Sequence, residues 1–433
     1  MRKLPVVIAL LVGFLVPGRL HAEPLSDVQK QLQQADRWPG VIHSNLGVTR
    51  KGTRIPCVYS EESLDVHNSK TRVLLVAGLK DQAGTAQSLQ MLQWFYTSDE
   101  AKPFRKTITL SAVPLVNPDE KPTPRFPPKG DSYLSKDNPE AEYVWRWIGM
   151  HAPDVVVCLM TGEEPRWWTP ETNHSNLKKL ADTLGKVSTF EPTDESAVML
   201  TKALMKSAPA NTGTIPAITA VVGKAGSKPE ARLHELFRAM DQSQFHGPSA
   251  ARRELQKRVD RTPVEIAKQL AKVYGHDLSS VQYIPALALV GRLWLGELTN
   301  DPTHRTDVER IVAPYLSQEK IALPKRFSGS HLAGHLIFGE LARTTKDQEK
   351  AKRYLELARL AGDTGFDAQG EMKPSMPAHS EMSDAVFMSC PILVETGVQT
   401  GEKKYLLMAG RHFDFMRKLV LREDGIYRHS PLC

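Results

Sequence analysis

The chain has 433 residues, of which 41% are hydrophobic and 24% are charged, values typical of a globular protein long enough for two domains. The formal net charge is +7, and Arg2, Lys3 and Arg19 supply three of these charges, leaving +4 for the remainder. A charge this small, on basic residues interspersed with acids, excludes recognition of nucleic acid or of a membrane surface by charge alone.

Residues 1–22 have the pattern of a secretory signal peptide. A basic start at Arg2 and Lys3 precedes an apolar stretch, and Ala22 ends a plausible cleavage site. The stretch is shorter than the roughly 20 residues that cross a bilayer, and no later segment is apolar enough to do so. We therefore expect an exported protein, periplasmic or extracellular, without an integral membrane segment after the signal peptide. An uncleaved anchor is the alternative interpretation.

Residues 40–225 alternate short apolar runs with helical patterns. The predicted strands are 72–78, 107–116 and 154–160, and the predicted helices between them are 86–96 and 141–150. Continuous apolar runs that alternate with helices predict a mostly parallel sheet covered on both faces. The sequence therefore indicates an α/β domain in this region.

The order of motifs in this domain is VLLVAGLKDQAGT, then VPLVNPDE, then PDVVVCLMTGE. This order resembles that of zinc carboxypeptidases of the M14 type, which have His-x-x-Glu after the first strand and another histidine after the last. The corresponding positions hold Lys80, Asp81 or Gln82, and Met160. An ammonium, an amide and a thioether cannot replace imidazole and carboxylate around zinc. The resemblance thus implies a carboxypeptidase-like domain without zinc ligands, with a sugar- or peptide-binding accessory domain as its expected role. Arg125 either matches a substrate-binding arginine or is a solvated loop residue.

From residue 233 to residue 433, amphipathic helices follow one another. Three similar joints between helices lie about fifty residues apart, a period typical of stacked helical hairpins. The joints are Thr299-Asn300-Asp301, Thr345-Lys346-Asp347 and Thr400-Gly401-Glu402. Such hairpins predict either an α-solenoid or a closed α/α toroid.

Asp384 is the most informative acid of this helical region. The segment 379–388 (HSEMSDAVFM) places Glu381 and Asp384 three residues apart at the beginning of a predicted helix. A carboxylate in that position can cap the helix, because it accepts hydrogen bonds from the first amides and is favoured by the helix dipole. It can equally point into a pocket as a general acid.

An ordered set of motifs surrounds Asp384. The set is Asp384, Phe387-Met388, Pro391, Thr400-Gly401-Glu402, Tyr405 and Gly425-Ile426-Tyr427-Arg428-His429. Over residues 265–433 it resembles the unsaturated glucuronyl and rhamnogalacturonyl hydrolases of glycoside hydrolase families 88 and 105. The resemblance implies a partial (α/α)6 toroid with Asp384 as its catalytic residue, and substrate contacts from His379, Met388 and His429.

The same resemblance implies a reaction on an oligosaccharide that ends in a 4,5-unsaturated uronic acid, without a metal or cofactor. Asp384 would protonate the double bond and then take a proton from the attacking water, and the resulting hemiketal would open and release the partner sugar. The sequence departs from the family in two places. Met382 and Ser383 stand where an aromatic residue is usual, and residues 328–335 lack the family's second aspartate. Fewer helices are predicted than a complete barrel has, which indicates a fragment.

Other features leave room for alternatives. His331 and His335 have a spacing that can hold zinc on a helix, but Leu332 stands where a metalloprotease has its glutamate, so helix packing or barrel lining is the preferred interpretation. The four cysteines do not make a disulfide framework. Besides the exported glycosidase, the sequence admits a non-catalytic helical-repeat protein that binds carbohydrate or peptide and, with less support, a metallocarboxypeptidase.

Overall fold

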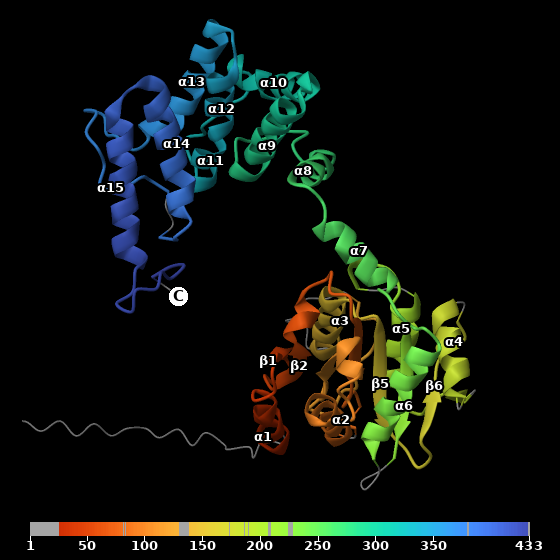
Figure 1. The fold of residues 1–433 in the computed structure, drawn as a ribbon. Helices are drawn as coiled ribbons and strands as arrows, with labels where there is room; N and C mark the ends of the chain where they lie inside the picture. The colour runs from red at the N-terminus through yellow and green to blue at the C-terminus, as the bar shows by residue number, and fades with distance from the viewer. Residues whose placement is uncertain are drawn as a thin grey trace, which may run out of the picture. The chain divides into compact units, whose positions relative to one another are not determined.

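The computed structural model describes residues 26–80, 82, 84–129, 138–172, 174–185, 187–188, 190–206, 209–223, 228–378 and 381–431. The chain divides into two compact units, Met1–Asp260 and Arg261–Cys433 (Figure 1). The predicted signal peptide lies outside the described residues. In the described part of the chain, no helix has the length and apolar character needed to cross a membrane.

The first unit contains a mixed sheet with the strand order β1-β2-β4-β3-β5-β8-β6-β7. Strands β3, β4, β5 and β8 pair in parallel at the centre, whereas β1, β2 and β6 add antiparallel pairs. The strands are β1 Val41–Val48, β2 Arg54–Ser60, β3 Thr71–Val76, β4 Ile108–Val113, β5 Val155–Thr161, β6 Arg166–Trp168, β7 Val187–Ser188 and β8 Ala217–Val222. The predicted parallel centre is confirmed, and the sheet as a whole is mixed.

Helices cover both faces of this sheet, which explains why its central strands are apolar without alternation. Along β3, Val73 and Leu75 belong to one core, and Leu74 and Val76 belong to another on the opposite face. The helices are α1 Ser26–Ala35, α2 Thr85–Thr97, α3 Pro139–His151, α4 Ser175–Leu184, α5 Glu195–Lys206, α6 Pro229–Gln242 and α7 Ala250–Val259. Side chains of α1, α2, α4 and α6 join the first core, and those of α3 and α5 join the second.

The second unit consists of helices in hairpins. They are α8 Pro263–Ala271, α9 Tyr283–Thr299, α10 Pro302–Leu316, α11 Gly329–Gly334, α12 Leu336–Thr344, α13 Gln348–Asp363, α14 Ala385–Thr400 and α15 Lys403–Val420. Helix α9 pairs with α10, α12 with α13, and α14 with α15, and α12 contacts both α9 and α14 (Figure 1). We call α9, α12 and α14 the inner helices.

The predicted joints lie where these hairpins turn. Asn300 and Gly401 adopt left-handed conformations that end α9 and α14. The Asp301 side chain accepts a hydrogen bond from the amide of Thr303 and so caps α10, and the Asp347 side chain caps α13 in the same way. Helical hairpins are therefore present as expected, and closure into a toroid stays a prediction.

Candidate functional site

The predicted zinc positions lie at the carboxyl ends of the central strands of the first unit. The amide of Asn117, after β4, donates to the carbonyl oxygen of Gly78, after β3, over 2.8 Å. Lys80 is exposed, Gln82 is half-buried and Met160 is buried at 8% exposure, while Asp81 lies outside the described residues. In the described part of the chain, no three His, Cys, Asp or Glu side chains are grouped so that they could hold a metal ion.

Polar side chains of several kinds lie at this edge of the sheet. Asn117 is fully buried, and its Nδ2 donates to the carbonyl oxygen of Pro122 over 3.3 Å, while its Oδ1 and the Thr85 hydroxyl have no partner. Arg125 is exposed and lines a cavity of about 520 Å³ together with Glu195. This arrangement can bind a polar ligand, but the residues that line the cavity include one carboxylate, Glu195, and no imidazole, which is not the ligand set of a zinc site.

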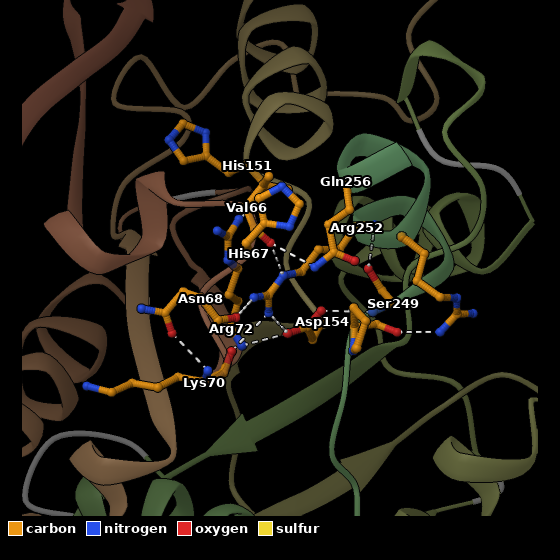
Figure 2. A network of polar contacts seen from close by, with 12 residues as sticks. Val66, His67, Asn68, Lys70, Arg72, His151, Asp154, Ser249, Arg252 and Gln256 are labelled. Atoms are coloured by element: carbon orange, nitrogen blue, oxygen red, sulfur yellow. Dashed lines mark hydrogen bonds and ion pairs between the residues drawn. The ribbon is translucent and has the colours of Figure 1, made fainter. Parts of the chain in front are cut away.

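The most extensive polar network of the first unit surrounds Asp154 (Figure 2). This carboxylate accepts hydrogen bonds from the amides of Arg72 and Ser249 over 2.9 and 2.8 Å, and its ion pair with the Arg252 guanidinium spans 2.7 Å. The two charged side chains are 0% and 2% exposed. Burial raises the pKa of Asp154, while the charge of Arg252 and the hydrogen bonds oppose this rise.

Arg252 uses its remaining N–H groups on the loop before β3. It donates to the carbonyl oxygens of Val66 and Lys70 over 3.0 and 2.9 Å, and to that of Asn68 (Figure 2). Helix α7 is thereby fixed to the sheet domain by one guanidinium, each of whose three nitrogens donates a hydrogen bond. The Asp154 carboxylate and the Arg252 guanidinium are both buried and paired with each other, so we assign this pair a structural role.

In the second unit, Asp384 immediately precedes α14 and is exposed. Its side chain makes no capping hydrogen bond. The amide of Ser383 donates to the carbonyl oxygen of His429 over 2.8 Å, and the amide of Arg428 donates to that of Val420 over 3.0 Å. The loop after α15 therefore lies against the beginning of α14, which brings together the two segments that carry Asp384 and His429. The His429 side chain is exposed.

His412 of α15 fixes the position of this helix start. Its fully buried ring accepts a hydrogen bond from the amide of Met376 at Nδ1 over 3.2 Å. The proton is therefore on Nε2, which donates to the carbonyl oxygen of Ala385 over 3.1 Å. His412 thus joins α15, the loop before α14 and the first turn of α14. No motif in the sequence distinguishes it from the other histidines. His379, in that loop, lies outside the described residues.

Phe387, three residues after Asp384, contacts an aromatic side chain of α9. The rings of Tyr283 and Phe387 contact each other edge to face with centroids 6.5 Å apart, and Phe387 is 43% exposed. The amide of Tyr283 donates to the Ser330 hydroxyl over 3.3 Å. Met388 is half-buried, close to Gly329. The beginnings of α9, α11 and α14 therefore meet, and we call Tyr283, Ser330, Asp384 and Phe387 the helix-start surface.

The histidine pair of α11 has a packing role. His335 is fully buried and donates from Nδ1 to the carbonyl oxygen of His331 over 2.7 Å, which leaves Nε2 unprotonated and without a partner. Burial lowers the pKa of His335 to about 4. His331 instead directs its Nδ1 to the Ser328 hydroxyl, over 3.1 Å. The geometry agrees with the packing interpretation of this pair.

No family model and no curated protein matches the chain. A metallocarboxypeptidase from Burkholderia cenocepacia is 12% identical with a TM-score of 0.38, covering 50% of this chain and 68% of its own. A metallocarboxypeptidase from Pseudomonas aeruginosa is 14% identical with a TM-score of 0.36, and the match covers 49% of this chain and 67% of that one. Carboxypeptidase A from Helicoverpa armigera is 12% identical with a TM-score of 0.36, and the match covers 52% of this chain and 72% of that one.

All three of these solved structures are carboxypeptidases by name. Likenesses at such TM-scores carry no conclusion about activity. None of them supports the glycoside hydrolase resemblance of the C-terminal region.

Proposed function

We propose that this is an exported protein whose helical unit binds an oligosaccharide at the helix-start surface. The observation that carries the proposal is the contact between the rings of Tyr283 and Phe387, together with the exposed Asp384 three residues before Phe387. A sugar ring has an apolar face that packs on an aromatic side chain, and hydroxyl groups that donate to a carboxylate. The beginnings of α9 and α14 also carry the positive ends of helix dipoles, which favour the carboxylate of a uronic acid.

Hydrolysis of an unsaturated uronyl end is the second candidate. The absence of a capping hydrogen bond favours it, because the Asp384 carboxylate is then available to a substrate. A general acid usually lies in a site that excludes water, whereas Asp384 is exposed. Binding is therefore proposed before catalysis. A metallocarboxypeptidase is not proposed, because Lys80 and Met160 stand where zinc ligands would be needed.

Titration calorimetry of the full chain with an unsaturated uronyl disaccharide tests the proposal, and the loss of near-ultraviolet absorbance of the double bond reports hydrolysis. We expect Phe387→Ala and Asp384→Asn each to weaken binding about tenfold, since each removes one central contact. Asp414→Asn changes an exposed acid of α15 and serves as the matched control.

Two results would contradict the proposal. One is that the wild-type chain binds no unsaturated or saturated uronyl oligosaccharide. The other is that Phe387→Ala and Asp384→Asn bind as tightly as Asp414→Asn. A loss of absorbance that disappears in Asp384→Asn would establish the hydrolase, whereas binding without any absorbance change would leave a binding protein.

A further inference from the structure

Near the opposite end of α9, Trp294 has an unusual environment. Its side chain is 57% exposed, whereas the other tryptophans of the chain are buried or half-buried. Its Nε1 donates to Oε1 of Glu340 on α12 over 2.8 Å. The hydrogen bond fixes the orientation of the ring, so Trp294 presents an ordered aromatic side chain to solvent.

Polar side chains continue from Trp294 across the other inner helices. Arg343 donates from Nε and Nη2 to both oxygens of Glu340, over 3.1 and 2.6 Å, and the Arg343 side chain is 51% exposed. On α14, Gln399 donates to the carbonyl oxygen of Gly339 over 2.8 Å. We call Trp294, Glu340, Arg343 and Gln399 the helix-end surface. It combines an aromatic ring with donors and acceptors held in place by one another.

The helix-end surface and the helix-start surface lie along the same helices. Trp294 follows Tyr283 by eleven residues on α9, which corresponds to about 16 Å at 1.5 Å per residue. Between them, Gly291 is exposed, and a Cβ atom at this position would meet no atom within 4 Å. The backbone of α9 is therefore open to close approach one turn before the Trp294 ring.

We propose that the helix-end surface is a second sugar subsite, so that the ligand is an oligosaccharide long enough to reach from Tyr283 to Trp294. This inference rests on the proposed function. The acidic end of the ligand lies at the positive ends of the helix dipoles of α9 and α14. Its interior sugars lie near the negative ends of the inner helices, where their hydroxyl groups can donate hydrogen bonds. Trp294 packs on one sugar ring, while Glu340 and Arg343 contact hydroxyl groups.

The test compares an unsaturated uronyl disaccharide with a hexasaccharide from a lyase digest of the same polysaccharide, both titrated into the full chain. A disaccharide is too short to span the two surfaces. We expect Trp294→Ala to weaken hexasaccharide binding about tenfold and to change disaccharide binding by less than about twofold. Leu298→Ala removes another exposed apolar side chain of α9, at 68% exposure, and is expected to change neither.

A second measurement uses iodide quenching, because Trp294 is the single tryptophan after Trp168. The difference in iodide quenching between the wild type and Trp294→Phe reports on Trp294. We expect the hexasaccharide to reduce this quenching and the disaccharide to leave it unchanged. Equal hexasaccharide affinities of wild type and Trp294→Ala, with disaccharide binding retained, would overturn this inference and leave the proposed function standing. Equal damage by Leu298→Ala would also overturn it, because the surface would then be only apolar. If neither sugar binds the wild type, the proposed function itself fails.

Discussion

The two units use their charged and aromatic side chains in opposite ways. In the first unit, Asp154 and Arg252 are almost fully buried, and their hydrogen-bonding groups hold the fold together. In the second unit, Asp384, Phe387 and Trp294 are exposed along the inner helices. An acidic residue therefore indicates a binding site only when its partners are known. A carboxylate that is surrounded by amides and a guanidinium, like that of Asp154, stabilises the fold instead.

The largest expected effect comes from removing the guanidinium of this buried pair. Arg252→Ala leaves Asp154 buried without a countercharge, so we expect the free energy of unfolding of the first unit to fall by about 3–5 kcal/mol. Urea unfolding followed by tryptophan fluorescence measures it, since six of the seven tryptophans precede residue 260.

The neighbouring arginine provides the control for that prediction. Arg253 is exposed, and its guanidinium donates only to the carbonyl oxygen of Pro248 among the hydrogen bonds of its side chain that the structure shows. Arg253→Ala should change the free energy of unfolding by less than about 0.5 kcal/mol. Equal effects of the two substitutions would show that the Asp154 network is not what holds α7.

Acid should weaken both units through one histidine in each. Burial lowers the pKa values of His151 and His335 to about 4, from 6.5 in an unfolded chain. The unfolded chain therefore takes up protons below pH 6.5 while the folded protein does not. The contribution of these two histidines to the free energy of unfolding is fully present above pH 6.5 and decreases as the pH falls toward 4. Below pH 4 these groups cause no further loss. The fully buried His335 contributes about 3 kcal/mol of this change.

Urea unfolding at intervals between pH 7 and pH 4 checks this dependence. In His335→Gln, an amide can still donate to the carbonyl oxygen of His331 but does not titrate. The pH dependence of the second unit should therefore become shallower in this variant, while that of the first unit stays the same. An unchanged slope in the second unit would contradict the assignment to His335.

The smallest expected effect separates two glycines of the helical unit. Gly410 lies in the middle of α15 with open space where a Cβ atom would be, so Gly410→Ala should raise the free energy of unfolding by about 0.5–1 kcal/mol. At Gly334, a Cβ atom would lie 2.5 Å from the carbonyl oxygen of Val281, so Gly334→Ala should lower it. Thermal unfolding of the two variants measures both changes. If both variants were more stable than the wild type, the contact between position 334 and the carbonyl oxygen of Val281 would have to relax without cost.

Local sequence patterns predicted the helices and strands of this fold better than they predicted which elements pack against one another. The apolar runs at 72–78 and 154–160 are strands β3 and β5, because a strand buried on both faces leaves its mark in consecutive residues. The helix predicted after Asp384 is α14, although it begins at Ala385 without a side-chain cap. The helical pattern from residue 233 does not reveal which core a helix covers, and α6 packs on the sheet.

The candidate site could be predicted only where its residues are near one another in sequence. Asp384 and Phe387 share one turn of helix, so a single motif contains both. Tyr283 lies 104 positions before Phe387, and their contact depends on how three hairpins stack. Trp294 occurs in an apolar helix pattern that equally suits a core residue, and only its exposure distinguishes it.

The Asp154–Arg252 pair also sets an order of events during synthesis. The two residues are 98 positions apart, so all strands of the sheet have left the ribosome before the guanidinium that neutralises Asp154 follows them. Until then, a nascent chain must either bury the Asp154 carboxylate without its ion-pair partner or leave the beginning of β5 exposed to solvent. Completion of the first unit therefore waits for α7.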